Sequence, residues 1–451
     1  MATTTDSTQS SELDTFIPYL RQELVHMCLG DGGLSQAEQQ QFCDFCDIFA
    51  AYTHFRSHIE NEKLKLDYAP FDPDSEMKLR TKHTSDELDE AEARVANAFR
   101  ELASNANFRQ MTREEIEDSF HKKSLLLVNT DVDLDVFDQV ECHVRGQDMR
   151  EGQRATWYMV PKTVTVEVWR RVLILIKFKE DKDLTKVQKE RLKKDQLPFE
   201  PGKFYSYLYK DVPKDDLEIL FPNVRVSMNM ADKIKLAIPA LAGMIVFIAK
   251  KGLSLLILVA LILLAFGIKL DRPEVEDVDP NNLKTVIAAL AGLAALLTLA
   301  FKQWTKFKAK RIAFLKEVSD HLFFRSIANN RAVFNRMTES GEEEDCKEAL
   351  LLYYHLLVQS KQGQQLNREQ LDGIVEGWMG KNFDTIIDFD IDDPVEKLKK
   401  VVGKTNAGEE KPLLVEDAQG KLHVPSLQEA KEIIDNIWDD AYQFSDTCPE
   451  V

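Results

Sequence analysis

The stretch VFIAKKGLSLLILVA, residues 246–260, places Lys250 and Lys251 inside the most hydrophobic region of the chain. That region contains three apolar runs, at 236–249, 252–268 and 285–301. A membrane-spanning helix needs about 17–25 apolar residues to cross about 30 Å of hydrocarbon. The second and third runs meet that length and the first does not, so the stretch predicts a transmembrane helical hairpin over 252–301.

The paired lysines indicate how such a hairpin would sit in a membrane. A lysine at the bilayer centre costs about 2.5–3.5 kcal/mol on insertion scales, so we expect both ammonium groups at the water boundary. Basic residues flank the hairpin and its connector is acidic, which predicts a two-pass membrane protein with both termini cytoplasmic. We expect contact with the bilayer surface, including anionic headgroups, at Lys250, Lys251, Lys302, Trp304, Lys306, Lys308, Lys310 and Arg311.

Two features of the hairpin region leave alternatives open. Residues 231–251 lie at the inner interface, re-enter the bilayer, or form a buried helix on the soluble part. Small residues in 285–301 allow close helix packing, either within one chain or between chains of a homo-oligomer. Neither expected span has an ionisable residue in its interior, which argues against an ion path.

Composition limits the remaining classes. The chain has 451 residues and a net charge of −18, which suggests two or three domains and argues against nucleic-acid binding. Six scattered cysteines are too few for a disulfide scaffold, so we expect them to be reduced. The polar, acidic N-terminus resembles neither a secretory signal nor a mitochondrial presequence.

The pattern of residues 1–230 predicts an α+β domain, cytoplasmic in the two-pass arrangement, with a flexible N-terminus. A capping box, Ser35 with Glu38, opens a helix in which aromatic residues recur at helical spacing at Phe42, Phe45, Phe49 and Tyr52. Prolines interrupt 68–76, and 85–103 returns to helix. From residue 124 apolar and polar residues alternate, including Asp131, Asp133 and Asp135, which predicts an antiparallel sheet with a central strand ending near 178.

The segment after the expected hairpin reads as mostly helical. We expect juxtamembrane helices over 302–361, the first of them continuous through 337. Residues 362–451 follow the order helix, helix, two strands around Gly420, helix, which resembles a winged-helix module. Carboxylates outnumber basic residues there, so phosphate would be repelled and a protein-contact or structural role is favoured over DNA binding.

Few residues suggest chemistry. Cys43 and Cys46 form a C-x-x-C with histidines nearby, but they lie within a predicted helix and lack a paired second half-site, so buried cysteines are favoured over zinc. The aspartates at 131, 133 and 135 could hold Ca²⁺, but a solvated strand face is favoured. No phosphate-binding loop and no hydrolase or metalloprotease motif occurs, so the sequence predicts no catalytic residue, metal or cofactor.

Three stretches carry a family resemblance: YKDVPKDDLEILFPNVRVSMNMADKIKL, FKQWTKFKAKRIAFLKEVSDHLFFRSIANNRAVFNRM and EEEDCKEALLLYYHLL. They resemble an uncharacterised two-pass membrane protein family that includes mitochondrial transmembrane protein 143 and bacterial relatives. The resemblance implies architecture rather than activity. Its polar positions here are Lys210, Asp211, Asp215, Glu218, Asn329 and Asn330. Arg331 and Ala332 depart from the family's small residue and glycine, which leaves a tight turn there open.

Three functional hypotheses follow. The first is a membrane-anchored scaffold or regulatory interaction protein at the cytoplasmic face of a membrane, with protein partners still to be identified. The second is an oligomeric channel or transporter component. The third is a membrane-tethered enzyme that uses the KDVPKDDLE segment, 210–218, whose alternative is a loop-to-helix junction.

Overall fold

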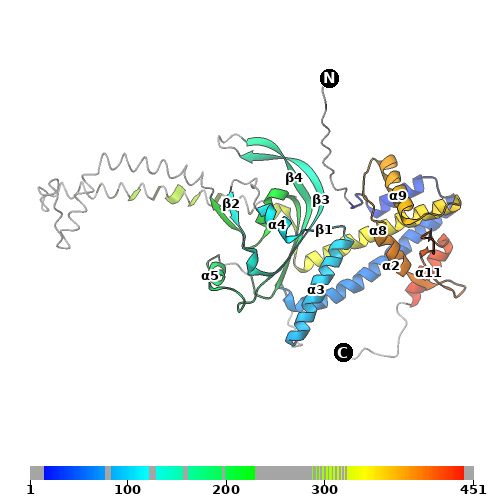
Figure 1. The fold of residues 1–451 in the computed structure, drawn as a ribbon, viewed down its shortest axis with the longest axis horizontal. Coiled ribbons are helices and arrows are strands. Elements are labelled where there is room, and N and C mark those ends of the chain that lie inside the picture. Colours follow the sequence, from blue (N-terminus) through cyan, green and yellow to red (C-terminus); the bar gives the residue numbers. More distant parts are fainter. Residues whose placement is uncertain are drawn as a thin grey trace, which may run out of the picture.

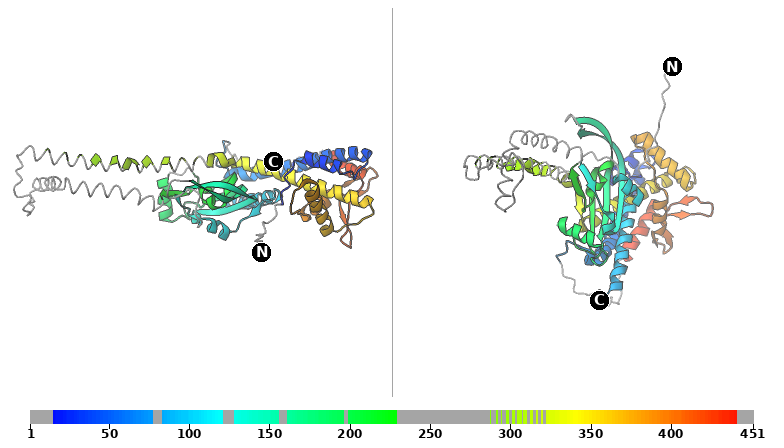
Figure 2. Two further views of the ribbon diagram at one scale, coloured as in Figure 1. Left: turned by 90° about the horizontal axis from the view of Figure 1, so that it is seen from above. Right: turned by 60° about the vertical axis from the view of Figure 1, so that its left-hand side comes forward.

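The computed structural model describes residues 15–76, 83–120, 128–155, 161–195, 199–228 and 322–440, with scattered positions between 287 and 319. Helices and an antiparallel sheet form adjoining halves of the described part (Figure 1). The predicted combination of helices and antiparallel sheet is therefore confirmed. Figure 2 shows the two long helices α2 and α8 running from one half into the other.

Three helices begin the chain: α1 (Arg21–Gly30), α2 (Gln36–Tyr68) and α3 (Ser85–Asn105). The predicted capping box at Ser35 and Glu38 starts α2, and the aromatic stripe faces the core. Helix α2 ends at Tyr68, where the 3₁₀ turn Ala69–Phe71 contains a proline at its start. Thr84 caps α3, because its side chain accepts the Glu87 backbone N–H.

One five-stranded sheet dominates the second half. Its order is β1 (Arg109–Gln110), β3 (Phe137–Ala155), β4 (Pro161–Phe178), β5 (Phe204–Pro213), β7 (Ser326–Asn329), and every neighbouring pair is antiparallel. The apolar strand β4 lies at the centre, as its composition predicts. Shorter elements flank the sheet: α4 (Arg113–Phe120), β2 (Val128–Asp131), α5 (Lys186–Asp195), β6 (Arg225–Met228) and the 3₁₀ turns η2 (Leu134–Val136) and η3 (Lys214–Leu220).

The backbone of the sheet is irregular at one position across its three central strands. Gly146 on β3 and Asp211 on β5 both lie opposite Arg170 on β4, and they have positive φ angles of 68° and 53°. A Cβ on Gly146 would lie 2.9 Å from the Arg170 Cδ, so the residue at 146 must lack one. The alternation of side chains between the two faces shifts here. Leu173 and Leu175 face the helices α2 and α3, whereas Trp169 packs into the core on the opposite face of the sheet.

Helix α8 (Arg331–Lys361) connects the two halves. Its first turns pack with α2 and α3 on one face of the sheet, through residues such as Phe334 and Met337. Its second half packs with α1, α2 and the C-terminal helices. The predicted continuous helix over 301–337 is wrong, because residues 326–329 pair with β5 as strand β7 before α8 begins.

The C-terminal elements follow α8 in the order α9 (Arg368–Phe383), α10 (Asp392–Lys400), β8 (Val402–Lys404), β9 (Glu410–Pro412), β10 (Val415–Glu416), β11 (Leu422–His423), α11 (Leu427–Asp440). The predicted turn at Gly420 joins β10 and β11. A second hairpin, β8 with β9, was not predicted. These elements share one hydrophobic core with α1, α2 and α8, so both ends of the described chain meet there.

The predicted transmembrane hairpin requires correction. Within the described residues, no helix combines the length and the apolar content needed to cross a bilayer. The longest described helices, α2 and α8, are interrupted by charged residues along their length. The membrane-anchored fold and the two-pass location with cytoplasmic termini are therefore not supported. The runs 236–249 and 252–268 and most of 285–301 lie outside the described residues.

Candidate functional site

One face of the sheet is covered by α2, α3 and the start of α8, and strand register orders its side chains into rows. Residues directly opposite each other on antiparallel strands point to the same face. Three successive rows across β3, β4 and β5 are Glu141–Leu175–Ser206, His143–Leu173–Leu208 and Arg145–Arg171–Lys210. The middle row contains two leucines, and a cavity lies toward each end of this face.

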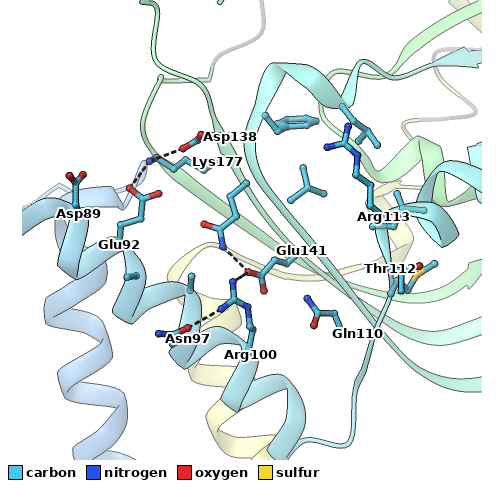
Figure 3. Close-up of a pocket in the computed structure, with 18 residues that line it drawn as sticks. Asp89, Glu92, Asn97, Arg100, Gln110, Thr112, Arg113, Asp138, Glu141 and Lys177 are labelled. Atoms are coloured by element: carbon cyan, nitrogen blue, oxygen red, sulfur yellow. Dashed lines mark hydrogen bonds and ion pairs between the residues drawn. The ribbon is translucent and has the colours of Figure 1, made fainter. Parts of the chain in front are cut away.

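The first cavity, here called the seam cavity, lies between α3 and the strands β3 and β4 (Figure 3). It has a volume of about 1090 Å³. Lys177 lies between Glu92 and Asp138, at 2.6 and 3.2 Å, and Arg100 lies 2.6 Å from Glu141 (Figure 3). These charged groups neutralise one another, so the seam cavity offers little net charge to a ligand.

Glu141 and His143 form a buried pair beside the seam cavity. The Glu141 Oε2 and His143 Nε2 atoms lie 3.5 Å apart, and neither makes a hydrogen bond within the described part of the chain. Burial alone would raise the pKa of Glu141, but interactions with His143, Arg100 and Gln139 outweigh it and lower that pKa. The carboxyl group is therefore held ionised and acts as a counter-ion for Arg100.

The second cavity, here called the junction cavity, lies where the sheet meets the helical half, and its volume is about 1010 Å³. Its walls come from β3, β4, β5, α2, the start of α8 and residues 15–21. The row Arg145–Arg171–Lys210 lines the sheet side. Three like charges therefore occupy directly opposite positions on adjacent strands about 4.8 Å apart, an arrangement that destabilises a sheet.

The opposite wall of the junction cavity carries four glutamates, and each has a partner. Glu342 lies 3.0 Å from the His54 ring. Glu343 accepts the backbone N–H of Arg21 at 2.7 Å. The two remaining carboxylates pair along α8, Glu339 with Arg336 and Glu344 with Lys347. Each of these carboxylates therefore has a nearer partner, although Glu344 also lies close enough to Arg145 for the two charges to interact.

The basic row itself is held in place from one end. The Arg145 Nη1 donates to the Ala106 carbonyl at 2.6 Å, and its guanidinium lies 4.2 Å from the Phe16 ring centre and 4.7 Å from that of Phe108. Among the described residues, no carboxylate lies within ion-pair distance of Arg171 or Lys210. Two cations of the row thus face the cavity with no counter-ion from the described chain.

Asn330 joins the sheet to α8 beside this region. It is 5% exposed and adopts φ 47°, ψ −128°, a backbone conformation that an asparagine rarely takes. Its Oδ1 accepts the Ser206 backbone N–H at 3.2 Å and its Nδ2 donates to Asp74 at 2.6 Å. The tight turn that the sequence left open is therefore present at Asn330, where α8 begins.

The other polar positions of the family resemblance are dispersed. Lys210 faces the junction cavity, whereas Asp211 lies 2.9 Å from Arg150. Asp215 and Glu218 lie in η3, where Glu218 is buried. Asn329 is the exposed last residue of β7. The KDVPKDDLE segment therefore forms a strand-to-3₁₀ junction, and its polar side chains do not converge on one site.

The candidate metal ligands are also dispersed. Within the described ranges, no group of three or more His, Cys, Asp or Glu residues is arranged to hold a metal ion. Cys43 and Cys46 lie within α2, and burial raises the pKa of Cys46 well above its usual value. The strand predicted through the aspartates at 131, 133 and 135 is wrong, because residues 134–136 form the turn η2. Asp135 instead lies 3.1 Å from Arg113.

The residues expected at a membrane interface fall into two groups. Lys302, Trp304, Lys306 and Lys308 are exposed helical residues, and the Lys308 ammonium lies 4.1 Å from the centre of a Trp304 ring. Lys250, Lys251, Lys310 and Arg311 lie outside the described residues.

Sequence reasoning missed Arg145 and Arg171. Each is a single basic residue within a strand, and such residues usually lie on a solvated face. One feature of the sequence could have indicated the basic row: Arg171 interrupts the alternation of apolar and polar residues just before the apolar run 172–176. Strand register, however, is needed to place it beside Arg145 and Lys210.

A family model described as a protein of unknown function (DUF3754) matches residues 169–332. The match extends from the middle of β4 to the first turn of α8, and includes Arg171, Lys210 and Asn330. Arg145 and the C-terminal helices lie outside it. The fold matches no solved structure. The chain is thus similar, over this central part, to a family whose activity is unknown.

Proposed function

We propose that this protein works by binding, as a regulatory interaction protein whose junction cavity receives a compact, doubly charged oxyanion of the phosphate type. The observation that carries the proposal is the row Arg145–Arg171–Lys210. Like charges on directly opposite residues lower the stability of a sheet, so an anion that neutralises them would recover that free energy.

Two features favour a compact dianion. A singly charged carboxylate would neutralise only one member of the row, whereas a tetrahedral oxyanion offers acceptors in several directions to neighbouring donors. The glutamates on the α8 wall, Glu339, Glu342 and Glu343, would repel an extended acidic segment that filled the whole cavity. The ligand would therefore lie against the sheet side.

The double variant Arg171→Gln/Lys210→Gln tests the proposal in the full-length protein by isothermal titration calorimetry with inorganic phosphate at constant ionic strength. We expect the unmodified protein to bind phosphate and the variant to bind it at least tenfold more weakly, because each charged hydrogen bond contributes about 1.5–3 kcal/mol. Without phosphate, the variant should be as stable as the unmodified protein or slightly more stable, since the like-charge repulsion is reduced.

Lys186→Gln/Lys404→Gln is the matched control, because both lysines are exposed and lie outside the cavity. It changes the net charge equally and should leave phosphate binding intact. Acetate should bind much more weakly than phosphate. The proposal would be refuted by a protein that does not bind phosphate, by equal affinity in the double variant, or by acetate binding as tightly as phosphate.

A further inference from the structure

Residues 15–21, here called the strap, line one side of the junction cavity and are anchored to α8 by buried charged groups. The Lys347 ammonium donates to the carbonyls of Ile17 and Tyr19 at 2.7 and 3.1 Å, and Glu344 accepts the Ile17 N–H at 3.2 Å. Glu344 and Lys347 are almost fully buried and lie 2.5 Å apart. The buried ion pair of Glu344 and Lys347 on α8 therefore forms hydrogen bonds with the backbone of the strap.

The strap also supplies part of the cavity wall. Phe16, Pro18, Tyr19, Leu20 and Arg21 all line it. The Phe16 ring centre lies 4.2 Å from the Arg145 guanidinium carbon and 4.9 Å from the Lys347 ammonium. Phe16 therefore joins the helix that anchors the strap to the first member of the basic row.

Stacking and anion binding use different parts of Arg145. An aromatic ring contacts the face of a guanidinium group, whereas its N–H donors lie along the edge and can reach an oxyanion. The two contacts can form together, and the ring limits the orientations that the guanidinium samples before a ligand arrives. Strap docking and anion binding should therefore favour each other.

We propose that the strap is a closing element of the junction cavity, coupled to the anion through Phe16 and Arg145. This inference rests on the proposed function. Because coupling between two equilibria is reciprocal, loss of the Phe16 ring weakens anion binding, and a bound anion stabilises the docked strap. Anion binding in the junction cavity would then change how firmly the strap docks on α8, and through α8 it would affect the helical half.

Phe16→Leu tests the coupling, since leucine retains apolar bulk without the aromatic face. We expect phosphate to bind this variant about three- to tenfold more weakly, the range that a partly desolvated cation–π contact accounts for. Phe16→Ala should weaken binding at least as much. Phe55→Leu is the matched control, because the Phe55 ring contacts Trp438 and does not line the cavity.

Hydrogen exchange supplies the reciprocal measurement. Saturating phosphate should slow amide exchange in residues 15–21, where the N–H groups of Ile17 and Arg21 donate to glutamates of α8. If phosphate binds but Phe16→Leu keeps full affinity and exchange in the strap is unchanged, the strap inference is wrong while the proposed function stands. If phosphate does not bind at all, both are wrong.

Discussion

We expect the buried side chain of Glu348 to lower the stability of this protein as the pH rises. The side chain is 3% exposed within α8, and its Oε1 accepts the Asn107 Nδ2–H at 2.9 Å. Its pKa is raised to about 8, mainly by burial; Asp393 and Asp345 act in the same direction, while the bond from Asn107 and the charge of Lys397 act against it. The folded protein therefore holds Glu348 neutral at pH 7, where the unfolded chain has it ionised.

The sign and size of the effect follow from proton linkage. Below pH 4.5 Glu348 is protonated in both the folded and the unfolded state, so it does not change the free energy of unfolding. As the pH rises from 4.5 to about 8, the unfolded state releases its proton first, so the free energy of unfolding falls by about 1.4 kcal/mol per pH unit. The loss is about 3 kcal/mol at pH 7 and at most about 5 kcal/mol above pH 8.

Glu348→Gln removes the titration and keeps an oxygen that can accept from Asn107. We expect the variant to match the unmodified protein within about 1 kcal/mol near pH 5 and to exceed it by several kcal/mol near pH 8.5. Urea unfolding of the full-length protein, followed by circular dichroism at both pH values, measures the difference. Glu101→Gln, an exposed carboxylate on α3, is the control. Stability profiles that run parallel for Glu348→Gln and the unmodified protein would refute the reasoning.

Two further variants test the junctions around α8. Asn330→Ala should lower the free energy of unfolding by about 2–3 kcal/mol, because it loses the hydrogen bonds to Ser206 and Asp74. Asn330→Gly should lower it by about 1 kcal/mol less, because glycine adopts the positive φ without strain. Equal urea midpoints for the two variants would contradict this. Asp345→Asn should raise the free energy of unfolding by about 1–3 kcal/mol at pH 7, because burial raises the pKa of Asp345 to about 6 even beside Lys397, so its ionisation opposes folding, and Lys397 keeps Asp393 as a partner; an unchanged urea midpoint would show that this burial cost is absent.

The sequence alone determined the local structure in several places. Ser35 with Glu38 starts α2, the aromatic stripe turns one helical face inward, and the apolar run before residue 178 becomes the central strand. Each of these outcomes depends on neighbours within a few residues of one another. The order of the C-terminal elements was also readable, although the β8–β9 hairpin was not, because its strands have only three residues each.

Tertiary structure alone decided the site. Arg145, Arg171 and Lys210 lie far apart in the sequence and meet only because the register of β3, β4 and β5 places them opposite one another. Likewise, Lys347 reaches the carbonyl of Ile17 across 330 positions of sequence. Neither contact leaves a local periodicity, because strand register and the packing of α8 are set by the whole core rather than by adjacent residues.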